Sequence, residues 1–199
     1  LPGVGFTRSR ALLHRWIELN AFTPIYRTHE GNQPDRHFQI DGDDETLAHF
    51  ARFARVFAAL APYRSKLCQV AAERGLPLVR HPWIHYPDDV EARATELQFM
   101  LGPDMMIGPV LDPKRDRVDL YLPAGHWRHL WTGEAVELDV GRWFSVAAPA
   151  GAPAVFCRAG SEVDREARAS LEETGDLSLS LSPKAQVVMD ELLRPKELI

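Results

Sequence analysis

The first candidate for chemistry is a polar run at residues 27–32, Arg-Thr-His-Glu-Gly-Asn, placed between two apolar parts of the chain. The preceding Thr-Pro-Ile-Tyr is rich in β-branched and aromatic types, and the pattern predicts a short strand over residues 23–29. Alternation along that strand would put Ile25, Arg27 and His29 on one side. Because an unpaired buried charge is costly, this side needs polar surroundings. Arg27 and His29 could face a cleft and hydrogen-bond a substrate's hydroxyl groups. The structural alternative is an ion pair for Arg27 and a capped carbonyl for His29.

Two further clusters suggest a metal site, and both have a simpler explanation. The acidic run at residues 41–45, Asp-Gly-Asp-Asp-Glu, has its glycine out of place for a calcium loop, and its carboxylates suit the start of a helix. His81 and His85 have the spacing of a helical metal pair, but Pro82 disfavours a helix and the glutamate of an HExxH motif is missing. The sequence therefore predicts no metal site and no cofactor.

Aromatic and sulfur side chains are the remaining candidates. Trp127, Trp131 and Trp143 could form a platform on which a sugar stacks, but aromatic residues in short strands are more often core, which is the interpretation we favour. Cys68 and Cys157 are too few for a disulfide framework and lack a CxxC spacing, so we expect two buried free thiols.

The elements that must position these residues change in character along the chain. Apolar residues at steps of three and four predict helices over residues 7–20 and 43–60, the second with an acidic start. Pro62 should break or kink the second helix, and a further helical stretch over residues 65–74 ends before Gly75. The apolar stretch that follows predicts a short strand.

After about residue 104 the sequence consists of short apolar or alternating runs separated by proline, glycine and charged turns. This pattern is typical of an antiparallel β-sandwich. Residues 164–199 are more charged and lack aromatic side chains, and one amphipathic helix is predicted there, at Lys184–Leu193. We interpret these residues as a tail.

The whole chain has 199 residues, of which 45% are hydrophobic and 26% charged, which is typical of a soluble globular protein. A formal net charge of −5 without a basic stripe argues against nucleic acid as a partner. No apolar segment approaches the roughly 18 residues of a membrane helix, and the N-terminus lacks the zones of a signal peptide. We therefore expect a cytoplasmic protein without a membrane partner. Whether the chain forms a homo-oligomer is left open at this point.

Several stretches together resemble the C-terminal part of glycoside hydrolase family 31, in order from about residue 7 to 163. They include a Trp-x-Glu-x-x-Ala-Phe-x-Pro segment, the segment Gln98 to Pro109 and a Leu-Pro-x-Gly-x-Trp hairpin. The residues that carry the first and the last of these are Trp16, Glu18, Ala21, Phe22 and Pro24, and Leu122, Pro123, Gly125 and Trp127.

The resemblance implies an α/β part followed by an all-β part. Residues 1–90 would form the C-terminal end of a catalytic (β/α)8 barrel, and residues 91–163 an antiparallel β-sandwich domain. Residues 164–199 would be a tail with one short helix. The implied partners are a small glycoside substrate and the remainder of the barrel.

Within that family, α-glucosidases commonly carry Arg-Asn-His-Asn at the position of the polar run. The order Arg27-Thr28-His29-Glu30-Gly31 is instead similar to the sulfoquinovosidase branch, which hydrolyses α-glycosides of a 6-sulfonated glucose. The resemblance implies that His29 hydrogen-bonds sugar hydroxyls where the glycosidic bond is cut, with Arg27 as a supporting neighbour.

Retaining glycosidases need two carboxylates about 5 Å apart. In this family both are aspartates on earlier barrel strands, the second in a Ser-Asp-Ile-Gly-Gly-like motif that the sequence does not contain. We therefore expect the chain to bind substrate as part of a larger enzyme, with no catalytic residue of its own. The alternative is a stand-alone carbohydrate-binding or structural β-sandwich module without catalysis. It requires that the helices at residues 9–20 and 44–74 find an apolar partner within the same chain.

Overall fold

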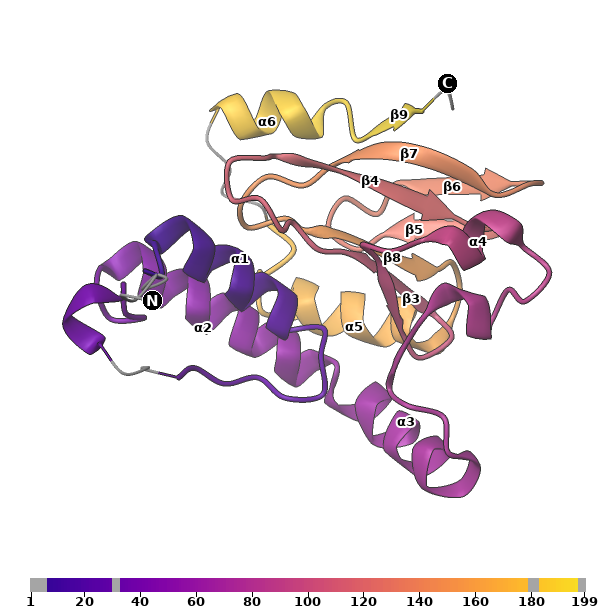
Figure 1. Ribbon diagram of the computed structural model, residues 1–199, viewed down its shortest axis with the longest axis horizontal. Coiled ribbons are helices and arrows are strands. Elements are labelled where there is room, and N and C mark those ends of the chain that lie inside the picture. The colour runs from indigo at the N-terminus through magenta and orange to yellow at the C-terminus, as the bar shows by residue number, and fades with distance from the viewer. Residues whose placement is uncertain (1–6, 30–32, 179–182, 197–199) are drawn as a thin grey trace, which may run out of the picture.

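The computed structural model describes residues 7–29, 33–178 and 183–196 (Figure 1). Three helices come first: α1 Arg10–Asn20, α2 Asp44–Ala59 and α3 Ala61–Arg74. One turn of 3-10 helix, Pro34–Arg36, lies between α1 and α2. A second such turn, Pro82–Ile84, and the short helix α4 Val90–Ala94 follow α3.

The starts of α1 and α2 follow from side chains that cap them. Ser9 accepts a hydrogen bond from the backbone N–H of Leu12, and Asp43 accepts one from the backbone N–H of Thr46 at 2.7 Å. Each bond satisfies an N–H that has no partner inside its helix. The acidic run at residues 41–45 is thus a helix start, as its pattern predicts.

The end of α2 and the start of α3 lie next to Pro62. Proline is compatible with the first turn of a helix, because the N–H that it lacks would have no helical partner there. Accordingly α2 ends at Ala59 and α3 begins at Ala61, with Pro62 in its first turn. Gly75 closes α3 with a positive φ of 69°, a conformation that favours glycine.

Nine strands form two sheets within the described residues, and all their pairings are antiparallel. The larger sheet has the order β1-β2-β3-β8-β5-β6 and the smaller has the order β4-β7-β9. The strands of the larger sheet are β1 Val79–Arg80, β2 Phe99–Leu101, β3 Met105–Gly108, β8 Ala154–Arg158, β5 Gly125–His129 and β6 Ala135–Leu138. Those of the smaller are β4 Arg117–Leu122, β7 Arg142–Ala147 and β9 Leu193–Pro195.

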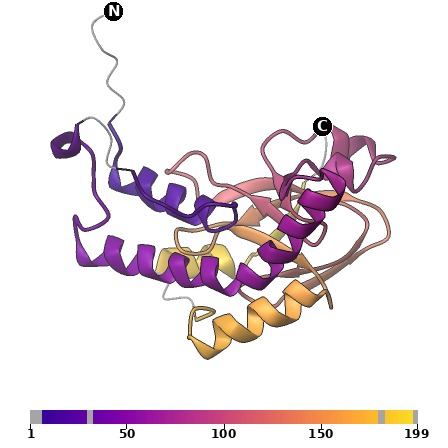
Figure 2. The ribbon, with the colours of Figure 1, turned by 90° about the horizontal axis from the view of Figure 1, so that it is seen from below.

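The helices α1, α2 and α5 Glu162–Glu173 gather beside the sheets, and α2 lies between the other two (Figure 2). Antiparallel strands therefore follow a helical first part, as the change of sequence pattern predicts. No parallel strand pair occurs among the described residues, so the barrel end implied by the family resemblance stays a prediction.

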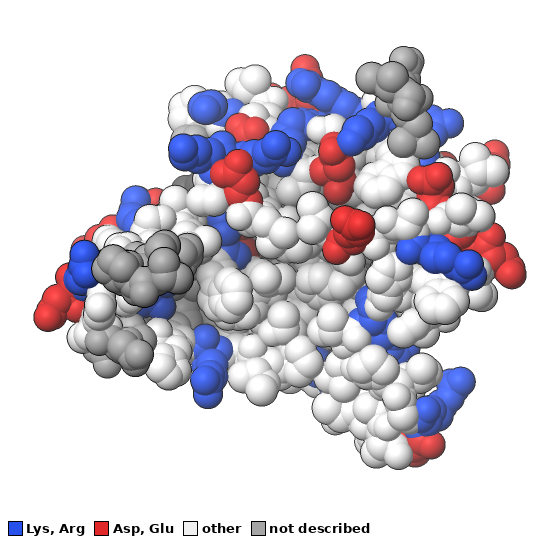
Figure 3. Space-filling model, viewed as in Figure 1, with Lys and Arg blue, Asp and Glu red and all other residues white. Residues whose placement is uncertain are grey.

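The face of the molecule that carries α1 is largely uncharged in its middle, with Lys, Arg, Asp and Glu gathered toward its edges (Figure 3). Trp16 on α1 is 56% exposed and Ile25, just after it, is 68% exposed. Large apolar side chains that are this exposed often mark a surface that another part of a protein covers.

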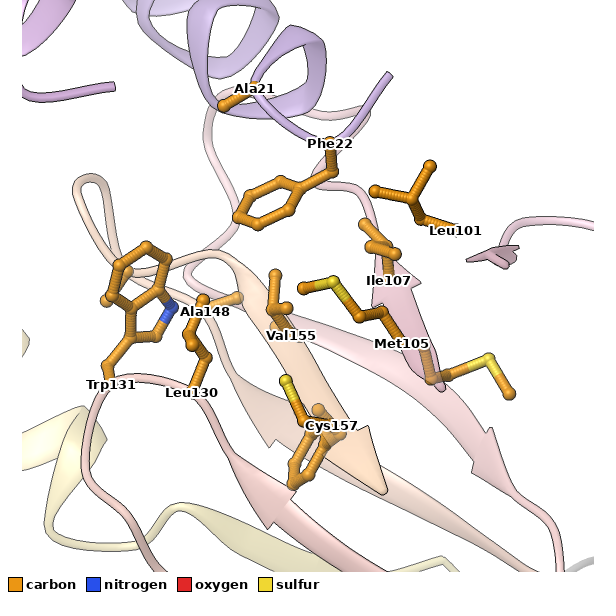
Figure 4. Close-up of a cluster of buried hydrophobic side chains, with 14 of the residues drawn as sticks. Ala21, Phe22, Leu101, Met105, Ile107, Leu130, Trp131, Ala148, Val155 and Cys157 are labelled. Atoms are coloured by element: carbon orange, nitrogen blue, oxygen red, sulfur yellow. The ribbon is translucent and has the colours of Figure 1, made fainter. Parts of the chain in front are cut away.

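One hydrophobic core joins the helices to the sheets. Phe22, directly after α1, points toward the strands that hold Ile107 and Val155 (Figure 4). Its ring meets that of Trp131 edge to face at 6.4 Å, and Phe53 of α2 meets the same indole at 6.1 Å. The apolar partner that the early helices need is thus present within the chain.

The C-terminal part is more ordered than its composition indicates. The sequence analysis missed α5, whose Val163, Ala167 and Leu171 are buried at helical spacing. The helix predicted at Lys184–Leu193 is present only as far as Met189, as α6 Pro183–Met189. The prediction is wrong at its end, because Leu193 begins β9, which pairs with β7.

The strand predicted over residues 23–29 is wrong. The backbone is irregular over residues 25–29, after a turn at the end of α1. A strand needs a neighbour for its N–H and C=O groups, and none of the described strands flanks this segment. The strand propensity of residues 23–29 could not show whether a neighbouring strand would be present.

The aromatic and thiol predictions have mixed outcomes. Trp127 and Trp131 are core, as predicted, whereas Trp143 is only half-buried. Cys157 is buried, but Cys68 is exposed, so the expectation of two buried thiols is wrong for Cys68. Cys68 lies on the outward face of α3, where helical periodicity alone did not tell the two faces apart. Among the described residues no helix is long and apolar enough to cross a membrane.

Candidate functional site

The cavity nearest the polar run has a volume of about 460 Å³ and opens beside α1. Its walls come from α1, from the irregular segment after it and from one residue of α2. The apolar lining residues are Leu13, Trp16, Ile17, Ile25, Tyr26 and Phe50, and the polar ones are Arg8, Asn20, Arg27, Thr28 and His29. An apolar wall with a few polar groups at one side is typical of a small-molecule site.

The segment that carries the polar residues is attached to α2 through Tyr26. The Tyr26 ring stacks on Phe50 at 5.1 Å and on Phe57 at 5.5 Å, and its hydroxyl donates to the Phe50 carbonyl oxygen at 3.0 Å. The Thr23 hydroxyl lies within hydrogen-bond distance of the Asn20 carbonyl oxygen and shapes the turn after α1. Side-chain contacts thus replace the strand pairing that the sequence predicts here.

The structure brings the two predicted site residues together at the rim of this cavity. Arg27 and His29 are both exposed and both line it. The alternation that predicts their common side is absent, yet both side chains still reach the same opening.

Sequence reasoning missed Arg8, which also lines the cavity. Its Nη1 donates to the His29 carbonyl oxygen at 3.0 Å, its Nε to the Phe38 carbonyl oxygen at 2.9 Å and its Nη2 to Gln39 Oε1 at 3.1 Å. Arg8 precedes the cap of α1, and nothing in the local pattern distinguishes it from the neighbouring arginines.

A second polar group, buried behind the cavity, joins α1 to the sheets. Glu18 is 1% exposed; its Oε2 pairs with Arg15 Nη1 at 2.9 Å, and its Oε1 accepts the backbone N–H of Gly151 at 2.7 Å. Arg15 also donates a hydrogen bond from its Nη2 to the Arg115 carbonyl oxygen at 2.8 Å. Burial raises the pKa of the Glu18 carboxyl, against the opposing effects of Arg15 and the Gly151 N–H.

Two histidines stack next to this carboxylate, between α1 and α2. The rings of His14 and His49 lie 4.4 Å apart, and His49 Nε2 is 3.5 Å from Glu18 Oε1. Burial is the main cause that lowers the pKa of both histidines to about 4, so both rings are neutral at pH 7. They are core side chains and not acid–base candidates for the cavity.

Arginines on α2 fasten the helices to the segment after α5. Arg55 forms a two-pronged ion pair with Asp176, with both N–O distances at 2.8 Å, and Arg52 donates to the Asp176 carbonyl oxygen. The Arg52 guanidinium also lies over the Trp131 ring at 4.9 Å. These contacts fix α2, and through Phe50 one wall of the cavity.

The cavity can bind a polar ring, but its described lining residues include no Asp or Glu. Histidine, arginine, asparagine and threonine supply hydrogen-bond donors and acceptors without a carboxylate nucleophile. Among the described residues, no group of three or more His, Cys, Asp or Glu side chains is arranged to hold a metal ion.

Comparison with known proteins gives the fold a family. The glycosyl hydrolase family 31 C-terminal domain matches residues 75–163. Sulfoquinovosidases of Escherichia coli K12 and Agrobacterium fabrum are 46% and 43% identical over 155 and 162 residues, which are 78% and 81% of this chain. The chain spans only 22% and 24% of the length of these two relatives.

Comparison with a solved structure supports the same family. A family 31 sulfoquinovosidase from E. rectale in complex with an aza-sugar inhibitor superposes with a TM-score of 0.78 at 38% identity, covering 84% of this chain and 25% of that one. The match of domain, sequence and fold leads to one conclusion: the chain belongs to glycoside hydrolase family 31, of which it carries the C-terminal region.

Proposed function

We propose that the chain is part of a retaining α-glycoside hydrolase that acts on α-sulfoquinovosides. The observation that carries this proposal is the identity of 46% with a protein named sulfoquinovosidase, over 78% of the chain. The sequence Arg27-Thr28-His29-Glu30-Gly31 resembles the motif of that branch. Its first three residues line the cavity, and the last two lie outside the described residues.

In this proposal His29 exchanges hydrogen bonds with the hydroxyl groups of the sugar, and Arg27 supports it from the same rim. The two catalytic carboxylates belong to a part of the enzyme beyond these 199 residues. The remainder of the barrel covers the exposed Trp16 and Ile25 and closes the cavity from the open side. The cytoplasmic location expected from the sequence belongs to the same proposal.

The test of the substrate uses the full-length enzyme with two chromogenic aryl glycosides, an α-sulfoquinovoside and the matching α-glucoside. We expect kcat/KM to be at least tenfold higher for the sulfonated sugar, because an enzyme that binds the sulfonate would leave the donors for that group unpaired when the neutral analogue binds. A preference for the α-glucoside would refute the substrate and leave the hydrolase class intact.

The test of the site is His29→Ala in the same full-length enzyme. Hydrogen bonds that strengthen as the sugar ring flattens contribute to turnover and not only to affinity. We expect kcat to fall by the equivalent of about 2 to 4 kcal/mol, as for removal of one preorganised transition-state donor. Unchanged kcat would remove His29 from the proposal. The isolated 199-residue chain should hydrolyse neither glycoside, and activity there would contradict the assignment of the carboxylates.

A non-catalytic sugar-binding or structural module is the second candidate, and one observation favours it. The sides of α1 and α2 that face the sheets are already covered within the chain, through Phe22, Phe53 and Trp131. A cooperative thermal melt of the isolated chain is therefore expected for both candidates and does not separate them. Binding of a glycoside by the isolated chain, together with an inactive full-length protein, would favour the module.

A further inference from the structure

The Arg8 side chain connects two stretches of the chain that are separated in sequence, His29 at the cavity rim and residues 38–39. Its three described hydrogen bonds run to the His29 carbonyl, the Phe38 carbonyl and the Gln39 side chain, over distances of 2.9 to 3.1 Å. The Arg8 backbone adds two bonds to the same region: its N–H donates to His37 Nδ1, and its carbonyl accepts the Phe38 N–H, both at 3.0 Å. Residues 8 and 37–39 therefore lie side by side.

The Gln39 side chain connects Arg8 to the turn that precedes Gln39 in the sequence. Its Oε1 accepts from Arg8 Nη2, while its Nε2 donates to the Pro34 carbonyl at 3.2 Å and to the His37 carbonyl at 3.1 Å. One amide side chain thus joins Arg8 to the short 3-10 turn at residues 34–36. The arginine and the glutamine thus tie His29 to residues 34–39.

The bond to His29 matters because the segment has irregular backbone. No strand ladder of the described residues fixes the peptide planes of residues 25–29, and the Tyr26 hydroxyl attaches the beginning of the segment to α2. Holding the His29 carbonyl oxygen orients the Cα–C bond of that residue and with it the direction in which the imidazole leaves the backbone. A side chain on such a segment needs a support of this kind to stay within the fraction of an ångström that catalysis requires.

We propose that Arg8 is a positioning residue for His29: through its bond to the His29 carbonyl oxygen it fixes the backbone from which the imidazole faces the sugar. This inference rests on the proposed function, and it adds a residue that neither the sequence pattern nor the family resemblance indicates. Arginine suits the role because its planar fork presents N–H groups in three directions, whereas a lysine ammonium at the same place could not reach all three acceptors together.

The catalytic test compares full-length Arg8→Met with Arg10→Met. Arg10 is the matched control, because it lies two residues away and its ion partners are Asp43 and Glu45 at the start of α2, not the loop. We expect Arg8→Met to lower kcat by about 10- to 100-fold with a small change of KM, and Arg10→Met to change kcat by less than about twofold. Arg8→Lys should recover less than half of the kcat that Arg8→Met loses, measured as the logarithm of kcat.

A double-mutant cycle separates positioning from general stability. If Arg8 acts through His29, adding Arg8→Met to His29→Ala should lower kcat by less than about threefold, because the group that Arg8 positions is already gone. Losses that multiply in the double variant would overturn the proposal, since Arg8 would then act independently of His29.

A readout without catalysis keeps the proposal testable if the enzyme hydrolyses no glycoside at all. Trypsin can cut after the exposed Arg27, and loosening of the loop should speed that cut. We expect the Arg27–Thr28 bond to be cleaved at least fivefold faster in Arg8→Met, but at the wild-type rate in Arg10→Met. Equal cleavage rates in Arg8→Met and the wild type would overturn the proposed role of Arg8. Gln39→Ala is the milder variant if Arg8→Met fails to fold, and it should shift both readouts in the same direction by a smaller factor.

Discussion

Replacing Arg15 by methionine removes the charged partner of a carboxylate that has almost no contact with water. Glu18 is 1% exposed and Arg15 is 6% exposed, and their N–O distance is 2.9 Å. Methionine keeps an apolar stem of similar length, so the change removes the pairing with Glu18 and the bond to the Arg115 carbonyl with little loss of packing. The folded protein must then bury an unpaired charge or neutralise it.

The free-energy cost of neutralising Glu18 sets the expected loss of stability in Arg15→Met. Protonating a carboxyl with an ordinary pKa of about 4.3 costs about 4 kcal/mol at pH 7, at 1.36 kcal/mol per unit of pH, and only about 1 kcal/mol at pH 5. The value at pH 7 lies within the range of about 3 to 5 kcal/mol for breaking one side of a buried ion pair. His49, 3.5 Å from Glu18 Oε1, could take up the proton instead, and the loss would again shrink as the pH falls.

Urea unfolding of the 199-residue chain at pH 7 and pH 5 measures this difference. With a slope of about 2 kcal/mol per molar urea, Arg15→Met should lower the midpoint by about 2 M at pH 7 and about 0.5 M at pH 5. Arg10→Met should leave both midpoints almost unchanged, since Arg10 and Asp43 are each 38% exposed. A loss for Arg15→Met that is equal at the two pH values, or no larger than that of Arg10→Met, would refute the reasoning.

Three further predictions concern the stability of the chain. Burial lowers the pKa of His14 and His49 to about 4, so the unfolded chain binds more protons between that value and 6.5. The free energy of unfolding should therefore fall as the pH drops through this window, and His49→Gln should flatten that fall in urea midpoints. Phe22→Ala, at a position 0% exposed, should cost about 3 to 5 kcal/mol of unfolding free energy, measured in the same way. Gly102→Ala should lower Tm by several degrees, because φ is 60° and a Cβ there would collide with Tyr63; an unchanged Tm would contradict the left-handed backbone at this turn.

The helices and the antiparallel sheets could be predicted from the sequence because their signals are local. Asp43 marks a helix start through its side-chain carboxylate and Gly75 marks a helix end through its left-handed backbone, and both act as their types predict. The segment at residues 25–29 could not be predicted in this way, since a strand exists only where a neighbouring strand offers its N–H and C=O groups. Exposure of Cys68 likewise depends on which helix face the rest of the chain covers.

Arg27 and His29 could be singled out because their types and the family resemblance point to the same polar run. The supporting residues could not be found so readily, because their partners lie far along the chain. Arg8 bonds to atoms up to 31 residues away, and Glu18 accepts the N–H of a residue 133 positions later. No spacing rule within a window of one helix or one strand connects such pairs.

The contact between Arg52 and the carbonyl of Asp176 spans 124 residues and has a consequence for synthesis on the ribosome. At about 5 to 20 residues per second, α2 emerges roughly 6 to 25 seconds before the segment that fastens it. Trp131, which packs against Phe53 of α2, emerges 78 residues after it, so this part of the apolar helix face lacks its partner for roughly 4 to 16 seconds. Slower synthesis lengthens this exposure, whereas cooling weakens the hydrophobic association of such intermediates. The yield of soluble chain should therefore depend more on chaperones that hold nascent helices than on the stability of the finished fold.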